Sequence, residues 1–181
     1  MATMLDTLYI AWQEALVNVG WKTNKARVFE YIRTSRQRSY VADEVDDPSN
    51  SWCGDFVFWV LRQAGVKPLP GNYESRPAPM GSNAIARYTE AYPQVNDPQS
   101  GDIYYMPINA MGVQKDHVGF VWNADNPSAI RTIDGNTDGG LGGNISLLVK
   151  GLGGGYVTYN TRSPSQTKLF FYRVPYDPET V

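Results

Sequence analysis

Residues 50–61 read NSWCGDFVFWVL and contain Cys53, the single cysteine of the 181-residue chain. Apolar side chains recur after Cys53 at the spacing of a buried helix. Asn50 and Ser51, which come just before it, are residue types that favour the N-cap of a helix. Gly65 can end the helix, because glycine readily adopts the left-handed conformation found at helix C-termini. The pattern therefore predicts a buried helix that begins near Cys53.

Cys53 carries the chemistry of this predicted helix. The free N–H groups and the dipole at a helix N-terminus favour a thiolate over a thiol, and the thiolate is the nucleophilic form. A free cysteine can equally be a small buried apolar residue. The helix alone leaves both interpretations open.

Composition limits the classes of partner. A net charge of −2 and a pI near 5.4 give no basic surface for phosphates, so we expect no nucleic-acid partner. One histidine and one cysteine argue against a zinc site built from such ligands, and we expect neither a metal nor a cofactor. The single cysteine also excludes an intramolecular disulfide.

The start of the chain lacks the basic residues and the apolar run of a signal peptide. No stretch reaches the roughly 18 apolar residues that a membrane span needs. We therefore expect synthesis in the cytoplasm without a signal peptide, and no membrane insertion.

The pattern along the chain predicts helices first and strands second. Residues 4–19 are expected to form an amphipathic helix whose inward apolar residues are Leu5, Leu8, Tyr9, Trp12, Leu16 and Val19. Further helices are expected at 24–34 and 83–92, and strands at 101–106, 117–122, 130–133, 145–150, 156–161 and 168–174. We predict one α+β domain, 1–181, in which a helical part (1–92) packs on an antiparallel β-sheet (100–175).

Three further polar residues complete a possible thiol hydrolase. His117 opens a predicted strand, and Asp134 and Asn136 flank a glycine in a predicted turn that closes the next strand. If these strands are antiparallel neighbours, His117 and Asp134 fall near the same end of the sheet. A histidine can then take the proton of the Cys53 thiol and later protonate a leaving amine, while a third group holds the imidazole. Taken alone, His117 would be a structural histidine.

Four short motifs resemble those of CHAP domains, the cysteine, histidine-dependent amidohydrolases/peptidases of the papain-like superfamily. They are SWCGDFV at 51–57, SGDIY at 100–104, DHVG at 116–119 and IDGN at 133–136. The resemblance implies a papain-like CHAP fold, with Cys53 as nucleophile, His117 as general base, and Asp134 and Asn136 completing the catalytic site. The acidic position is often Glu in the family, and the shorter Asp134 leaves open whether it or Asn136 orients His117.

The resemblance also implies a function, since CHAP domains cleave bacterial peptidoglycan. The expected activity is that of an N-acetylmuramoyl-L-alanine amidase or of a stem or cross-bridge endopeptidase. Two settings fit such an enzyme: a phage endolysin, or an antibacterial toxin delivered by type VI secretion into the periplasm or cell wall of a target bacterium. An injected toxin would require a cognate immunity protein. The alternatives are a catalytically silent papain-like binding module, or a cysteine protease or acyltransferase that acts on protein.

A proline-rich segment, 67–82, follows the predicted cysteine helix. Specificity often resides in loops beside a rigid scaffold, so we expect Tyr73 and Arg76 of this segment to bind substrate together with Trp52. Arg76 can pair with a carboxylate of a stem peptide, and Tyr73 can pack on its apolar part or on sugar. The alternative is that the segment only spans two elements.

Overall fold

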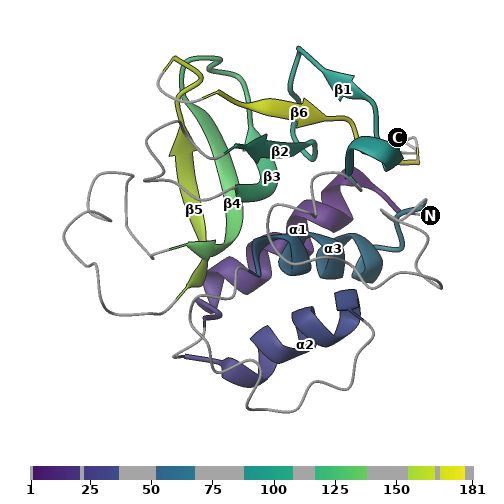
Figure 1. The fold of residues 1–181 in the computed structure, drawn as a ribbon, viewed down its shortest axis with the longest axis vertical. Coiled ribbons are helices and arrows are strands. Elements are labelled where there is room, and N and C mark those ends of the chain that lie inside the picture. Colours follow the sequence, from purple (N-terminus) through teal and green to yellow (C-terminus); the bar gives the residue numbers. More distant parts are fainter. Residues whose placement is uncertain are drawn as a thin grey trace.

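Helices come first and strands second in the structure, a computed structural model that describes residues 2–20, 23–36, 52–67, 88–107, 117–137, 155–165 and 168–177. The helices are α1 (Met4–Leu16), α2 (Lys25–Arg36) and α3 (Cys53–Gln63). The strands are β1 (Gln94–Val95), β2 (Ile103–Met106), β3 (His117–Asn123), β4 (Ile130–Thr137), β5 (Tyr156–Arg162) and β6 (Phe170–Tyr172). This order, with the helices packed on the sheet (Figure 1), confirms the predicted α+β class.

The strands form one antiparallel sheet in the order β1-β6-β2-β3-β4-β5. β3 and β4 are neighbours, and Gly119 lies opposite Asp134 in their register. Because side chains alternate between the two faces of a strand, His117 lies on the same face of β3 as Gly119. The two strands are thus antiparallel neighbours, which is the condition under which His117 and Asp134 were expected near the same end of the sheet.

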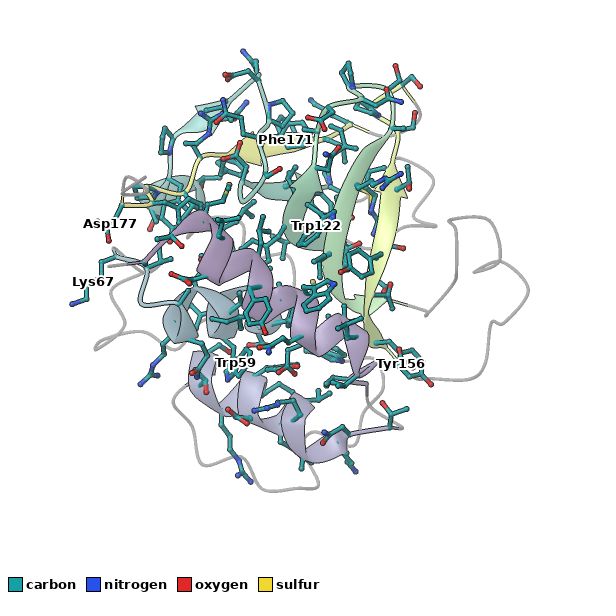
Figure 2. The ribbon with its side chains drawn as sticks, turned by 180° about the vertical axis from the view of Figure 1, so that it is seen from behind. Trp59, Lys67, Trp122, Tyr156, Phe171 and Asp177 are labelled. Carbon is teal, nitrogen blue, oxygen red and sulfur yellow. The ribbon has the colours of Figure 1, made fainter. Side chains whose placement is uncertain are left out.

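α3 covers the other face of β3 and β4 and forms the centre of the core. Its Phe56 ring meets Phe120 of β3 edge to face, with ring centroids 6.4 Å apart. Tyr31 of α2 brings a second helix against α3, with its ring 5.5 Å from that of Phe56 and 5.0 Å from that of Trp59. The indole N–H of Trp59 also donates to Glu30 of α2 at 3.0 Å, at the junction seen in Figure 2. These aromatic contacts fix the position of α3 on the sheet.

The helix α3 starts and ends close to the predicted residues, but its N-cap differs from the prediction. Trp52 occupies the N-cap position and makes no side-chain capping bond, so neither Asn50 nor Ser51 is the cap. Ala64 is the C-cap, and Gly65 follows with a positive φ of 78°, as predicted for the end of the helix.

The predicted inward face of α1 is partly wrong. Leu5, Tyr9 and Leu16 are more than half exposed, whereas Leu8 and Ala11 are buried. Polar residues also occupy the inner face, since Thr7 and Glu14 are buried: Thr7 bonds to the helix backbone, and Glu14 accepts a hydrogen bond from Tyr31. Apolar spacing identified the helix but misplaced its buried side, because buried polar residues with hydrogen-bond partners were not counted.

The sequence Asp134-Gly135-Asn136 is part of β4 and not a turn, which corrects the prediction. β4 continues to Thr137 and pairs with β5, with an irregularity in register between Asp134 and Thr137. Asn136 has a positive φ of 60° at this irregularity, a conformation that asparagine tolerates better than most residues.

Other predictions meet the structure unevenly. The helix at 24–34 and the strands at 101–106, 117–122, 156–161 and 168–174 are confirmed within a few residues, and the described residues 88–91 are helical. The short strand β1 was not predicted. The predicted strand 145–150 and its glycine-rich neighbours lie outside the described residues, as do residues 68–87. None of the described helices has the length and apolarity to cross a membrane.

The two ends of the described chain are joined. The Ala2 N–H donates to the Asp177 carboxylate at 2.7 Å, and the Asp177 N–H donates to the Ala2 carbonyl at 3.0 Å. Nearby, the Tyr176 hydroxyl donates to the Gly101 carbonyl at 2.7 Å, just before β2. Figure 2 shows Asp177 beside the start of α1. The chain ends thus lie together at one edge of the fold.

Candidate active site

Cys53 is the first residue of α3, as predicted, and only 1% of its surface is exposed. Its neighbours on the helix press against β4: a Cβ atom at Gly135 would lie 2.6 Å from Phe56 Cβ and 2.9 Å from the Trp52 ring. Glycine at 135 therefore allows the start of α3 to approach the strand that carries Asp134 and Asn136. Direct contact between the Cys53 thiol and the His117 imidazole stays a prediction.

His117 and Asp134 lie side by side, as predicted. The Nε2 atom of His117 is 3.8 Å from Oδ2 of Asp134. The Asp134 side chain is completely buried, and 11% of the His117 side chain is exposed. Nε2 has no hydrogen-bond partner among the residues that the structure describes. The carboxylate is thus the polar group that faces this side of the imidazole.

Four side chains donate hydrogen bonds to the Asp134 carboxylate. The Tyr104 hydroxyl donates to Oδ1 at 2.7 Å. Oδ2 accepts bonds from Asn160 Nδ2 at 2.6 Å, from Thr132 Oγ1 at 3.2 Å, and from Arg162 Nη2. A buried carboxylate is expensive without such partners, and here both oxygens are satisfied.

None of these four donors was identified from the sequence. Their common feature is a face of the sheet: Thr132 lies opposite Asn160 and Ile130 lies opposite Arg162 in the pairing of β4 with β5. Alternation by two residues then places 130, 132 and 134 on the same face as 158, 160 and 162. The polar residues at every second position from 158 to 162 are visible in the sequence. They indicate contacts with Asp134 only when β4 is known to be the neighbour of β5.

Gly119 leaves the space that the Asp134 carboxylate occupies. A Cβ atom at this position would collide with Asp134 Oδ1 and would lie 2.8 Å from both the Ile133 carbonyl and the Tyr104 ring. The glycine of the DHVG motif therefore lets the acidic side chain cross the neighbouring strand toward Tyr104.

Electrostatics keep the imidazole neutral. Burial lowers the pKa of His117 to about 4, against the opposing influence of the Asp134 carboxylate and with a further lowering by the Arg162 guanidinium. Burial also raises the pKa of Tyr104 well above its usual value, so its hydroxyl remains a donor. At neutral pH His117 is therefore a free base that can accept a proton.

Asn136 is placed differently from Asp134. Its side chain lies against Gly155, where an added Cβ atom would lie 2.8 Å from Asn136 Cα and 3.0 Å from its Cγ. Of the two residues that the sequence left open, Asp134 is the one whose side chain faces the His117 Nε2 atom. The geometry favours Asp134 as the orienting group, while the catalytic role of either residue stays a prediction.

Of the three predicted substrate-binding residues, the structure describes only Trp52. Tyr73 and Arg76 lie outside the described residues. Trp52 is 2% exposed and packs 5.8 Å from the Tyr31 ring, measured between centroids. That burial gives Trp52 a packing role, and its contact with substrate stays a prediction.

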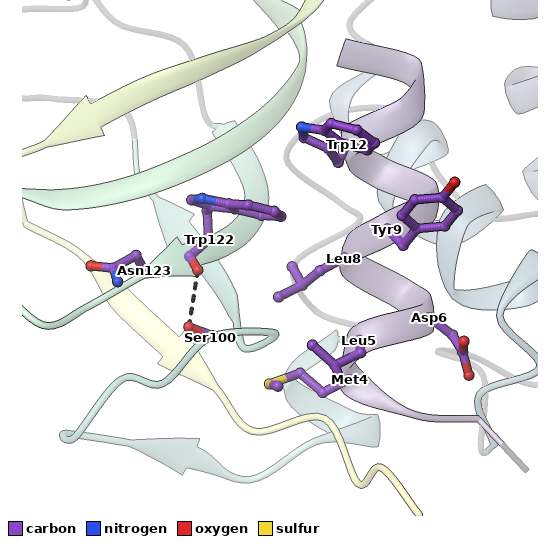
Figure 3. A pocket seen from close by; sticks show the side chains of 9 residues that line it. All are labelled: Met4, Leu5, Asp6, Leu8, Tyr9, Trp12, Ser100, Trp122 and Asn123. Atoms are coloured by element: carbon purple, nitrogen blue, oxygen red, sulfur yellow. Dashed lines mark hydrogen bonds between the residues drawn. The ribbon is translucent and has the colours of Figure 1, made fainter. Parts of the chain in front are cut away.

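A separate pocket of about 600 Å³ lies between α1 and the far end of β3 (Figure 3). Its lining residues are Met4, Leu5, Asp6, Leu8, Tyr9, Trp12, Ser100, Trp122 and Asn123. Trp122 is five residues from His117 along β3 and, by alternation, on the opposite face of the sheet. The Ser100 hydroxyl is already bonded to the Trp122 carbonyl at 2.9 Å. This mostly apolar hollow is therefore distinct from the site around His117 and Asp134.

Comparison with known proteins gives one distant structure and one family. No curated protein matches the sequence. A solved structure described as a wild-type endolysin, LysIME-EF1, is similar with a TM-score of 0.41 and 15% identity; the likeness covers 84% of this chain and 64% of that chain. The chain thus spans less than two thirds of that protein's length.

The family model for the CHAP domain matches residues 45–136, about half of the chain. The match begins before Cys53 and ends at Asn136, so it includes both strands that bring His117 and Asp134 together. The chain belongs to the CHAP domain family, the cysteine, histidine-dependent amidohydrolases/peptidases.

Proposed function

We propose that the protein is a peptidoglycan hydrolase that cleaves an amide bond of the bacterial cell wall through a Cys53 thiolate. The observation that carries the proposal is the His117 imidazole held beside the buried Asp134 carboxylate, on two strands that pack against α3, the helix that Cys53 begins. A cysteine at the start of a helix, a base, and an acid that orients the base are the parts that a thiol hydrolase needs.

The proposed mechanism begins with a proton transfer from Cys53 to His117. Nε2 of His117 faces Asp134, which supports Nδ1 as the nitrogen that takes this proton. The thiolate attacks the amide carbonyl, and the backbone N–H groups at the start of α3 stabilise the oxyanion. Protonated His117 then gives its proton to the leaving amine as the C–N bond breaks. A water molecule, deprotonated by His117, hydrolyses the thioester and restores the thiol.

Two amide bonds of peptidoglycan suit this chemistry. One joins the lactyl group of muramic acid to L-alanine, and the other lies within the stem or cross-bridge peptide. Both present an acyl carbon to the same nucleophile, so the proposal includes an amidase and an endopeptidase as its two forms.

We further propose a role against bacteria. The CHAP family membership suits either a phage endolysin or an antibacterial toxin delivered by type VI secretion into the periplasm of a neighbour. As a toxin the protein would be held inactive in its producer by an immunity protein that covers the active site.

The test is digestion of purified sacculi, with the released fragments identified by mass spectrometry. An amidase frees the muramic acid lactyl group and leaves an alanine amine, whereas an endopeptidase leaves a new amine within the peptide. Undigested sacculi together with tight sacculus binding would instead indicate a silent binding module. Cleavage of a protein substrate alone would indicate a cysteine protease.

Cys53→Ala and His117→Ala are the matched variants for this assay. Each should lower turnover by about a thousandfold or more, because nucleophile and base act as a unit. Melting temperatures close to that of the parent would show that the fold survives. Full turnover by a folded Cys53→Ala protein would disprove the thiolate mechanism.

A further inference from the structure

The buried carboxylate of Asp134 has a permanent cation as its partner. Arg162 Nη2 donates to Oδ2, and this is the oxygen that lies nearest His117. The Arg162 guanidinium also lies over the Tyr104 ring, with Cζ 5.6 Å from the ring centroid. Only 19% of the Arg162 side chain is exposed, so water screens this ion pair weakly.

His117 and Arg162 both lie beside Oδ2 of Asp134: Arg162 donates a hydrogen bond to it, and His117 Nε2 lies 3.8 Å from it. Among the described residues, the titratable and charged groups that face His117 are Asp134 from β4, Arg162 from β5 and Tyr104 from β2, and the proposed mechanism adds Cys53 of α3. Because Arg162 already balances the carboxylate, a proton on His117 would place a second positive charge beside it. The arrangement therefore favours a neutral imidazole.

We infer that Arg162 is a positioning residue that acts through Asp134: it fixes the carboxylate and balances its charge, so that His117 faces it as a neutral ring. The inference deepens the proposed thiolate mechanism and rests on it for its catalytic meaning. Its physical content, the control of the His117 protonation state by Arg162, can be measured without any substrate.

The direction of the effect follows from the neighbours of the imidazole. The Arg162 guanidinium acts to lower the pKa of His117 and the Asp134 carboxylate acts to raise it. Arg162→Gln removes the first influence and leaves the second without a balancing charge. Arg162→Lys keeps a charge but holds it on a compact ammonium that cannot lie flat over Tyr104 while reaching Oδ2. The glutamine variant should therefore change the titration most, and the lysine variant less.

The experiment is an NMR titration of the imidazole, which is unambiguous because the chain has one histidine. We expect the midpoint of His117 to rise by one pH unit or more in Arg162→Gln and by about half a unit in Arg162→Lys. Arg131→Gln and Arg131→Lys are the matched controls: Arg131 is exposed and, by alternation on β4, lies on the opposite face from Asp134. Both controls should leave the midpoint unchanged.

Alkylation of the single cysteine gives a second readout. An imidazolium stabilised by the freed Asp134 would stabilise the Cys53 thiolate in turn. The pH midpoint of iodoacetamide alkylation should therefore fall by about half a unit or more in Arg162→Gln.

The outcomes separate this inference from the proposed function. Identical titration and alkylation midpoints in the parent and in Arg162→Gln would overturn the inference, even if sacculi are digested. Shifted midpoints would support it, even if the parent leaves sacculi intact and the proposed function fails. Should the glutamine variant not fold, Arg162→Lys decides: a midpoint equal to those of the parent and of Arg131→Lys overturns the inference.

Discussion

His117 couples the acidity of the solution to the stability of the fold. Its pKa is about 4 in the folded protein and near 6.5 in an unfolded chain. Between these values the unfolded state binds a proton that the folded state does not, so stability rises with pH across this window. Acidification from pH 6.5 to 4 should therefore remove up to about 3 kcal/mol of folding free energy through this residue.

The check is urea unfolding of the parent and of His117→Asn at several pH values between 7 and 4. Carboxylates titrate in both proteins, so the difference between the two curves isolates the imidazole. The parent should lose more stability than the variant as the pH falls. Parallel curves would show that His117 is not held neutral by burial.

The sequence could identify residues that lie in a recognisable motif or that are the only ones of their type. The chain has one cysteine, Cys53, and one histidine, His117, and the glycine-containing motifs around His117 and Asp134 indicated the strands that carry them. Asn160 and Arg162 could not be found in this way, because the sequence does not show which strand lies beside 156–161. The described structure pairs that strand with β4, and this pairing brings both residues onto Asp134.

At the scale of the elements, two glycines set how closely other elements approach β4: Gly119 for β3 and Gly135 for α3. Gly119→Ala would place a methyl group against the Asp134 carboxylate and the Tyr104 ring, so we expect a loss of about 1 to 3 kcal/mol of stability and a large loss of sacculus turnover. Gly65→Ala is the control, because nothing lies within 4 Å of its added Cβ.

The control variant should still cost about 1 kcal/mol, since an L side chain is strained at the positive φ of Gly65. Its turnover per folded molecule should match that of the parent. Chemical denaturation and sacculus digestion measure the two effects separately. Equal turnover by Gly119→Ala would show that the carboxylate need not cross β3 at this point.

The buried side of α1 is a second test at this scale. Leu8 is 5% exposed and Leu16 is 58% exposed, although the sequence pattern placed both inward. Leu8→Ala should therefore cost about 2 to 4 kcal/mol, and Leu16→Ala no more than about 0.5 kcal/mol. Thermal or chemical unfolding of the two variants checks this ranking, and equal losses would restore the sequence-based orientation of the helix.

The error in α1 and the error at 134–136 have different physical causes. Apolar spacing fails on α1 because buried Thr7 and Glu14 find hydrogen-bond partners, which a count of apolar residues does not see. Asp-Gly-Asn resembles a turn because each residue type favours one locally. Within β4 the pairing with β3 and β5 overrides that preference and leaves only a local irregularity at Asn136.

At the scale of the whole molecule, the joined chain ends can be tested directly. Asp177→Ala removes the acceptor of the Ala2 N–H and should lower the free energy of unfolding by about 1 kcal/mol. Asp125→Ala is the control, because it removes the same charge from an exposed turn. Amide hydrogen exchange should quicken at the start of α1 in the first variant only, while sacculus turnover stays at the parent level in both.

The place of these joined ends has a consequence for anything fused to the protein. Ala2 and Asp177 meet beside Gly101, whereas His117 pairs with Met106 at the other end of β2. Gly101 precedes Met106 by five residue steps, most of them along β2, which is a span of at most about 16 Å. A tag, a tether or a second module attached before Ala2 or after Asp177 would therefore start from one corner of the described fold, at the opposite end of β2 from His117, and two such modules would begin as neighbours.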